Sequence, residues 1–297
     1  MYAVVGATGN TGRVVARTLL AADEDVLVIG RSRERLKPLV SEGAEAFAGS
    51  VEDAQSMSIA FSGALAAYCL LPVRYDAEDV PGFLRSVGVA LSAGIHEAGV
   101  QHVVFLSSIG AQHETGTGLI VALREQEQRF AKLSGVSVLS LRAGWFMENF
   151  RGQIRSIRET GTIATPLRGD LPIPMISAHD IGRYAAGRLA SRDFEGAATQ
   201  ELLGPRDVTL EEAVRVLGAA IGKADLRYVQ RSFEEFEETA REAGMSASAV
   251  RVLSEMYRAF NDGRVASEEG RSAESTTETT IGDYAEEFAK IYDAVGK

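Results

Sequence analysis

Residues 2–12 carry the clearest fold signal in the sequence: Tyr2-Ala3-Val4-Val5-Gly6-Ala7-Thr8-Gly9-Asn10-Thr11-Gly12. An apolar run predicts a buried strand, and a glycine-rich turn then opens an amphipathic helix. Because Gly6 and Gly9 lack side chains, the backbone can turn tightly and approach a pyrophosphate, while Gly12 lets the helix pack closely on the strand. The helix N-terminus presents free N–H groups to the phosphates. We therefore expect a dinucleotide cradle formed by Gly6, Thr8, Gly9, Asn10, Thr11 and Gly12.

The end of the second strand-like run, Val26–Ile29, indicates which dinucleotide is bound. In this type of fold, an acidic residue there accepts from a ribose hydroxyl, whereas an arginine pairs with a 2′-phosphate. The chain continues Gly30-Arg31-Ser32-Arg33 and offers no acid. We therefore predict NADP(H) rather than NAD(H), with Arg31 on the adenine or the 2′-phosphate and Arg33 assisting. The alternative is that both are exposed arginines at a helix start.

Composition limits the class of protein. The 297 residues suffice for one large domain or two unequal ones. Hydrophobic residues make up 45% and charged residues 24%, which argues against disorder throughout, collagen-like repeats and coiled coil. Acidic residues outnumber basic ones 41 to 31, so the positive excess that phosphate backbones attract is missing. We expect no direct nucleic-acid partner.

Cysteine and histidine usage argues against a metal centre. A single cysteine, Cys69, excludes an internal disulfide and a multi-cysteine site, and it fits a reducing compartment. None of the four histidines has the spacing of a metal ligand set, so we expect no metal. A strand-like run beginning at Tyr2 leaves no room for a signal peptide, and no apolar stretch approaches the ~20 residues that span a bilayer. We expect a cytoplasmic protein without membrane contact.

Short apolar runs alternate with helical patterns through the first half of the chain. The runs are 2–5, 26–29, 66–71, 103–106 and 136–141. This alternation predicts an α/β fold, a doubly wound parallel sheet of the Rossmann type. We expect a cofactor-binding domain over residues 1–150, with 176–195 packing back on it, and a smaller, mainly helical α+β lobe over 151–297.

The second half changes rhythm after Asn149. Glycines and prolines crowd residues 161–174 and predict an irregular connection. Ser177, followed by Asp180, predicts a capping box that opens a helix through Leu189. Residues 261–280 are polar and predict a mobile loop before a last helix that starts near Ile281.

Three motifs together resemble the NmrA-like group of atypical short-chain dehydrogenases. They are residues 6–12, residues 102–111 (HVVFLSSIGA) and residues 141–149 (LRAGWFMEN). The resemblance implies a Rossmann domain that binds NADP(H) and a smaller lobe that closes a cleft. It also implies one of two functions, because the group includes NAD(P)H quinone oxidoreductases and catalytically silent redox sensors that bind a transcription factor.

The chain departs from the wider superfamily at two places. Reductases of that superfamily use a Tyr-x-x-x-Lys pair, and the corresponding positions here are Ile120 and Arg124. Arg124 remains a candidate to contact the nicotinamide ribose or a substrate oxygen, although its guanidinium cannot act as a proton donor near neutral pH. Ser50 stands where relatives usually place an aspartate that meets the adenine amine, so only a weaker contact is expected there.

The remaining candidates cluster at the predicted carboxyl ends of the strands, where open α/β sheets bind ligands. Ser107 and Ser108 are candidates to orient a substrate carbonyl, and His113 is a candidate acid in the following loop. We expect Leu71 and Pro72 to pack on the cofactor, together with Ser107, Ser108, Arg124, Gly144, Trp145 and Phe146. A flat apolar acceptor site is expected at Trp145, Phe146, Asn149 and Phe150. Packing between the two lobes is the alternative for these aromatic residues, and Glu148 is expected to contact the cofactor or cap a helix.

Three functions remain open on this sequence. An NADPH-dependent oxidoreductase would transfer hydride to a quinone-like or conjugated carbonyl acceptor, which can take its proton from water and so tolerates the missing tyrosine. A redox sensor would bind NADP(H) and a protein partner without turnover. A specialised reductase or isomerase of a phenolic or polyketide-like metabolite would use Ser107, Arg124 or His113 instead of the pair. We rank the quinone-type reductase first because its small aromatic substrate suits the predicted apolar wall.

Overall fold

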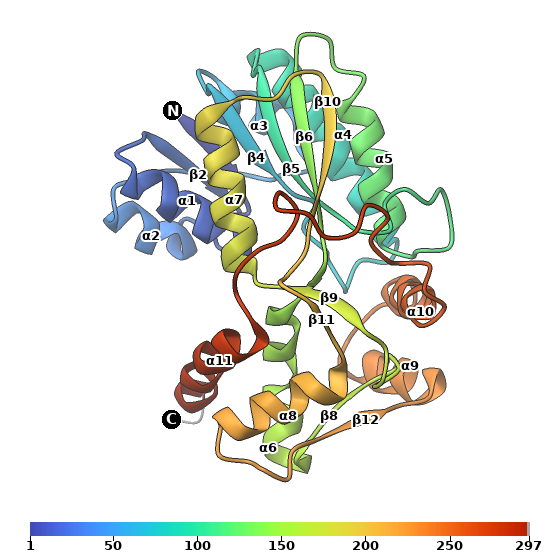
Figure 1. Ribbon diagram of the computed structural model, residues 1–297. Coiled ribbons are helices and arrows are strands. Elements are labelled where there is room, and N and C mark those ends of the chain that lie inside the picture. Colours follow the sequence, from blue (N-terminus) through green and yellow to red (C-terminus); the bar gives the residue numbers. More distant parts are fainter. Residues whose placement is uncertain (296–297) are drawn as a thin grey trace.

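A computed structural model describes residues 1–295, and its centre is a seven-stranded sheet (Figure 1). All neighbouring strands are parallel, in the order β10-β6-β5-β4-β1-β2-β3. The strands are β1 (Tyr2–Val5), β2 (Val26–Gly30), β3 (Glu45–Ala48), β4 (Ala66–Cys69), β5 (His102–Ser108), β6 (Ser137–Ala143) and β10 (Ala197–Leu202). This arrangement confirms the predicted Rossmann-like α/β fold.

Helices cover both faces of this sheet and bury its apolar side chains. One face packs against α3 (Ala54–Phe61), α4 (Val80–Ala98) and α5 (Ile120–Phe130). The other face packs against α1 (Asn10–Ala21), α2 (Arg33–Ser41) and α7 (Ala178–Ser191). Because both faces are covered, the central strands are continuous apolar runs. Cys69 is a fully buried core residue of this kind, as expected.

The chain leaves the sheet after β6, builds the first part of the smaller lobe, returns to the sheet through α7 and β10, and then completes the lobe (Figure 1). The lobe holds two small sheets, ordered β11-β9-β7 and β12-β8. Its strands are β7 (Trp145–Phe146), β8 (Thr162–Thr165), β9 (Ile173–Ile176), β11 (Asp207–Val208) and β12 (Arg227–Gln230). Its helices are η1 (Met147–Gln153, a 3-10 helix), α6 (Ile154–Thr160), α8 (Leu210–Ala220), α9 (Phe233–Glu242), α10 (Ala247–Asn261) and α11 (Ile281–Val295). Residues 161–174, expected to be irregular, therefore contain β8 and part of β9.

The prediction of a mobile polar loop over residues 261–280 is not supported by its contacts. Leu203 and Thr276 form a parallel β-bridge, and the Glu201 carboxylate accepts from the Glu268 N–H at 2.9 Å. Val265 is 4% exposed. The polar side chains of this segment form hydrogen bonds with the sheet edge, so their composition reflects pairing rather than lack of order.

Helix α7 begins differently from the predicted capping box. The Ser177 hydroxyl accepts from the His179 N–H at 3.1 Å, as a cap should. The Asp180 carboxylate, however, accepts from the N–H and the hydroxyl of Thr279 at 3.0 and 2.7 Å. Asp180 thus holds the start of the last helical segment rather than the start of its own helix.

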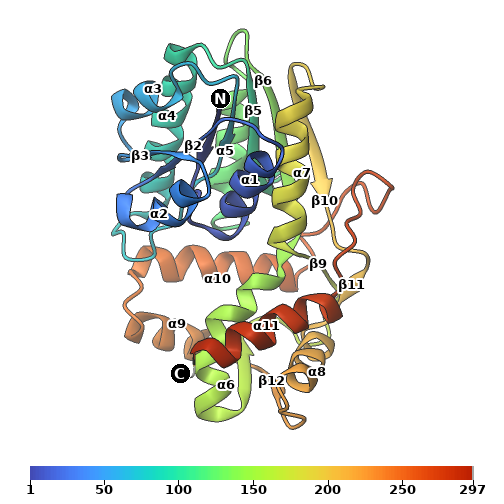
Figure 2. The same cartoon turned by 90° about the vertical axis from the view of Figure 1, so that its left-hand side faces the viewer.

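The second lobe lies at the carboxyl ends of the sheet strands. Figure 2 shows α10 lying across this end of the sheet domain, with α9, α11 and α6 beyond it. The lobe has its own apolar core, which includes Phe150, Leu217, Phe260 and Phe288. Within residues 1–295, no helix combines the length and the apolar composition that crossing a bilayer requires. Because the lobe lies at the carboxyl ends of the strands, its interface with the sheet falls where an α/β fold binds its ligands.

Candidate active site

The glycine-rich turn leaves three N–H groups of the first helix without acceptors. Gly6 adopts a φ of +67°, a left-handed conformation that favours glycine, and its carbonyl accepts from the Gly9 N–H at 2.9 Å. Gly9 is the N-cap of α1 and supplies no side-chain cap. The N–H groups of Asn10, Thr11 and Gly12 find no acceptor within residues 1–295. The geometry and the dipole of this end of α1 therefore favour the binding of an anion.

Gly9 and Gly12 differ in what surrounds them. A Cβ atom at Gly12 would lie 2.5 Å from the Gly6 carbonyl oxygen and 2.8 Å from its carbon, so the helix is pressed against the turn. A Cβ atom at Gly9 would lie 3.2 Å from the Gly6 oxygen, and no other atom outside Gly9 and its two chain neighbours would lie within 4 Å of it. The missing side chain of Gly12 thus lets α1 pack against the turn, whereas the space beside Gly9 is open.

Two side chains of the cradle are already engaged within the protein. Thr11 is 3% exposed, and its hydroxyl accepts from Tyr68 at 2.9 Å, so the side chain faces the sheet and leaves only its N–H for a phosphate. The Asn10 amide oxygen accepts from the Arg151 guanidinium at 3.1 Å. Arg151 in turn pairs with Glu287 at 2.8 Å, which links the cradle to the smaller lobe.

The arginines predicted to bind the 2′-phosphate are exposed in the structure. Arg31 and Arg33 follow β2, and within residues 1–295 neither side chain pairs with a carboxylate or a hydrogen-bond acceptor. Ser50 is also exposed, and its hydroxyl accepts from the Glu52 N–H at 3.2 Å in a local turn. The arginines therefore remain available to an anion, while the Ser50 oxygen is used locally.

A cavity of about 590 Å³ lies between the strand ends and the smaller lobe. The sheet side contributes Leu70, Leu71, Leu106, Ser107, Ser108 and Gly144. The lobe side contributes Trp145, Phe146, Asn149, Phe150, Phe236, Leu253, Met256, Tyr257 and Phe260. No acidic, basic or histidine side chain is among the lining residues of the described chain. Leu70 joins this cavity to the cradle, because its side chain lies against Gly6.

The two strand-end serines line the cavity with hydroxyls that are engaged elsewhere. Ser107 is 3% exposed and donates to the Glu127 carboxylate at 2.6 Å. Arg142 donates to the same carboxylate at 2.8 and 3.1 Å, and this hydrogen bond raises the pKa of Arg142. Ser108 donates to the Ile109 carbonyl at 2.9 Å. The predicted role of either hydroxyl in orienting a carbonyl would require one of these bonds to break.

The structure does not bring Arg124 or His113 into the cavity. Arg124 donates to the carbonyl of Gln112 at 2.9 Å and pairs with Glu114 at 3.2 Å, so its guanidinium holds the loop after β5. The His113 ring bonds the Arg264 carbonyl at 2.9 Å. Ile120, one helical turn before Arg124, does line the cavity. Pro72 is not among the lining residues, although its neighbours Leu71 and Val73 are.

Glu148 caps a helix other than its own. It is 5% exposed and accepts from the Ala178 N–H at 2.9 Å, at the start of α7. Burial raises the pKa of Glu148, while the Ala178 N–H and the nearby Arg151 act in the opposite direction. The carboxylate therefore joins the two lobes at the chain's return to the sheet, outside the cavity lining.

Sequence reasoning missed the wall that α9 and α10 supply. Phe236, Leu253, Met256, Tyr257 and Phe260 all line the cavity, and Tyr75 faces it from the loop after β4. The spacing of the four α10 residues indicates one helix face. Nothing in the local sequence shows that this face meets strand ends more than a hundred residues earlier.

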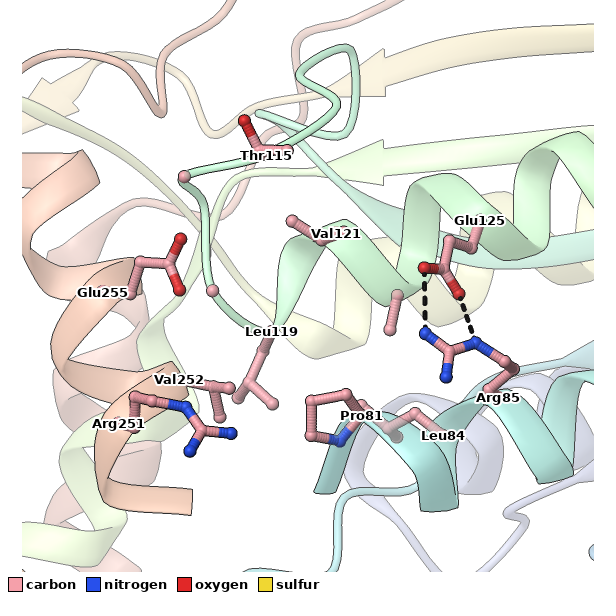
Figure 3. Close-up of a pocket in the computed structure, with 13 residues that line it drawn as sticks. Pro81, Leu84, Arg85, Thr115, Leu119, Val121, Glu125, Arg251, Val252 and Glu255 are labelled. Carbon is pink, nitrogen blue, oxygen red and sulfur yellow. Dashed lines mark hydrogen bonds and ion pairs between the residues drawn. The ribbon is translucent and has the colours of Figure 1, made fainter. Parts of the chain in front are cut away.

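A second, smaller groove of about 290 Å³ lies where α10 meets α4 and α5 (Figure 3). The Arg85 guanidinium pairs with the Glu125 carboxylate at 3.1 Å on one rim, and Arg251 and Glu255 stand on the other. Leu84 and Leu119 line both this groove and the larger cavity, so they form part of the partition between them. Within residues 1–295, no group of three or more potential metal ligands gathers at this groove or elsewhere.

Comparison with known proteins finds relatives that are named reductases. An NAD(P)H azoreductase of Xenophilus azovorans is 28% identical over 257 residues, which cover 86% of each chain. The Citrobacter sp. triphenylmethane reductase superposes with a TM-score of 0.79 at 22% identity, covering 97% of this chain and 99% of the other. An NADPH-dependent quinone oxidoreductase of Escherichia coli, in complex with NADPH, superposes with a TM-score of 0.78 at 22% identity over 97% and 99%. The model of the NmrA-like family matches residues 2–293, and the chain belongs to that family.

Proposed function

We propose that this protein is an NADPH-dependent oxidoreductase that reduces a small, flat aromatic acceptor of the quinone or azo class. The observation that carries the proposal is the position of the cavity. It opens at the carboxyl ends of β4, β5 and β6, and it meets the glycine-rich cradle through Leu70. A dinucleotide whose pyrophosphate lies on α1 would then extend its nicotinamide to the cavity wall.

The residues of the cradle fit such a cofactor. The free N–H groups of Asn10, Thr11 and Gly12 would hold the pyrophosphate, and the open space beside Gly9 would admit it. Arg31 and Arg33 would pair with the 2′-phosphate, which favours NADPH over NADH. Such a cofactor would supply a hydride to an acceptor in the cavity, whose lining includes Ser108, Gly144 and Trp145.

The lining of the cavity indicates the class of acceptor. Aromatic rings from η1, α9 and α10 would stack on a flat ring system or contact its edge. The rings of Trp145 and Phe150 already pack edge-to-face, with their centroids 4.9 Å apart. A charged sugar nucleotide or an organic acid would find no charged side chain to pair with. The aromatic acceptors named for the azoreductase, dye reductase and quinone reductase relatives support the same class.

A steady-state test separates the enzyme from a silent sensor. Loss of the NADPH absorbance band would be followed with benzoquinones, naphthoquinones and azo dyes, and the uncatalysed rate would be subtracted. Saturable turnover by the wild type, abolished in Gly9→Val, is the expected result. Tight NADPH binding without turnover on any acceptor would contradict the proposal and point to the sensor.

A further inference from the structure

Most hydroxyl groups that line the cavity already have partners in the protein. Ser107 donates to Glu127, and Ser108 donates to the Ile109 carbonyl. The Thr165 hydroxyl bonds the Tyr228 hydroxyl at 2.6 Å and accepts from the Leu167 N–H at 3.3 Å. Polar groups on an acceptor molecule would therefore compete with existing bonds at all three positions.

Tyr257 differs from these residues. It lies on α10, in the wall opposite the strand ends, and its ring meets Phe236 edge-to-face at 5.2 Å. Its hydroxyl bonds no group within residues 1–295, although the ring is packed against the core of the lobe. In the described part of the chain, five other polar side-chain atoms are fully enclosed and have no hydrogen-bond partner, but the Tyr257 hydroxyl is not among them. The hydroxyl thus has a free hydrogen to donate and is not fully enclosed by the protein.

The surroundings keep this phenol neutral. Burial raises the pKa of Tyr257 to about 12, and the neighbouring Tyr75 contributes in the same direction. No charged side chain lines the cavity to offset this effect. At neutral pH the Tyr257 oxygen therefore carries its proton and acts as a hydrogen-bond donor.

We propose that Tyr257 is a catalytic residue whose hydroxyl donates a hydrogen bond to the acceptor atom on which negative charge develops. The inference rests on the proposed function. When a hydride adds to a quinone or an azo group, the electron pair of the double bond moves to the remaining oxygen or nitrogen. The Tyr257 hydroxyl stabilises that charge, the reduced acceptor takes one proton from water, and NADPH becomes NADP⁺. A donor placed on developing charge acts more strongly in an apolar cavity than in water.

The test compares two kinds of acceptor in Tyr257→Phe. A naphthoquinone develops negative charge on oxygen, whereas a cationic triphenylmethane dye accepts hydride on its central carbon and becomes neutral without needing a proton. We expect kcat with the quinone to fall about 10- to 100-fold, while KM and the Kd of NADPH change little. The rate with the dye should change less than about twofold, because no negative charge forms. Tyr292→Phe is the matched control, since it removes a phenolic hydroxyl on α11 that does not line the cavity.

Each result of this comparison supports or overturns the proposed role of Tyr257. An unchanged quinone kcat in Tyr257→Phe would overturn the proposal, and so would an equal loss with quinone and dye, because that pattern indicates a disturbed cavity. If the wild type does not reduce the dye, the quinone kinetics of Tyr257→Phe decide alone. A change in KM without a change in kcat overturns the proposal, and a fall in kcat without a change in KM supports it. A wild type that binds NADPH but reduces nothing would refute the proposed function itself.

Discussion

Replacing Gly9 with valine should strongly weaken NADPH binding while leaving the fold largely intact. Gly9 has a φ of −82° and a ψ of 179°, values that any residue adopts, so the substitution brings no backbone strain. Only the Gly6 oxygen, at 3.2 Å, restricts the new Cβ atom. The branched side chain would occupy the open space in front of the three free N–H groups, where the pyrophosphate must approach.

The size of the effect follows from those hydrogen bonds. A hydrogen bond to a charged group contributes about 1.5–3 kcal/mol. Loss of two of the three N–H contacts would cost at least about 3 kcal/mol, which weakens binding by about 100-fold or more. Folding should lose little by comparison, because no apolar core atom lies within 4 Å of the new Cβ.

Gly12→Ala is the matched control because its Cβ would meet backbone rather than open space. The atoms of Gly6 at 2.5 and 2.8 Å cannot move without displacing the turn, so overpacking should cost about 1–3 kcal/mol. Calorimetric titration with NADPH and thermal melts on both variants would separate binding from stability. Undiminished NADPH affinity in folded Gly9→Val protein would refute the cradle, and with it the proposed function.

Three further outcomes follow from individual contacts. Arg31→Asp should weaken NADPH binding far more than NADH binding, because it places a carboxylate at the 2′-phosphate; an unchanged preference between the two cofactors would contradict the assignment. Burial holds the Glu148 pKa above its unfolded value, so the folded state binds the proton more tightly. The wild type should therefore gain stability relative to Glu148→Gln as pH falls from the folded pKa towards the unfolded one, and denaturant titrations at several pH values would show no such trend if the assignment is wrong. Arg124→Gln should lower Tm by a few degrees, because the contacts with the loop after β5 are lost, and it should leave the Kd of NADPH unchanged. A large loss of NADPH affinity would indicate that Arg124 contacts the cofactor.

The parts of the fold that sequence could predict depend on short-range patterns. The stretch from Tyr2 to Gly12 predicts a strand, a turn and a helix within one local unit, and its residues do form β1, the turn and the start of α1. Strand β3 escaped the list of apolar runs because it is a sheet edge with exposed or half-exposed residues. A continuous apolar run therefore marks a strand that is buried on both faces, and it does not mark an exposed edge strand.

The parts of the site that could not be predicted depend on long-range packing. Ser107 ends a strand as expected, but its hydroxyl meets a carboxylate 20 residues away, and no local pattern predicts that bond. Arg124 lies on the expected helix, yet the loop carbonyls before that helix bind its guanidinium. Tyr257 was missed because only the return of α10 to the strand ends places it on the cavity.

A single-turnover measurement would detect hydride transfer to an acceptor in this cavity. Enzyme saturated with NADPH, or with NADPH carrying deuterium at the transferred position of C4, would be mixed with increasing naphthoquinone in a stopped-flow instrument. Hydride transfer within the protein predicts an oxidation rate that saturates with the quinone, shows a primary deuterium isotope effect and exceeds the uncatalysed rate. A rate that rises linearly with quinone and equals the uncatalysed reaction would contradict it.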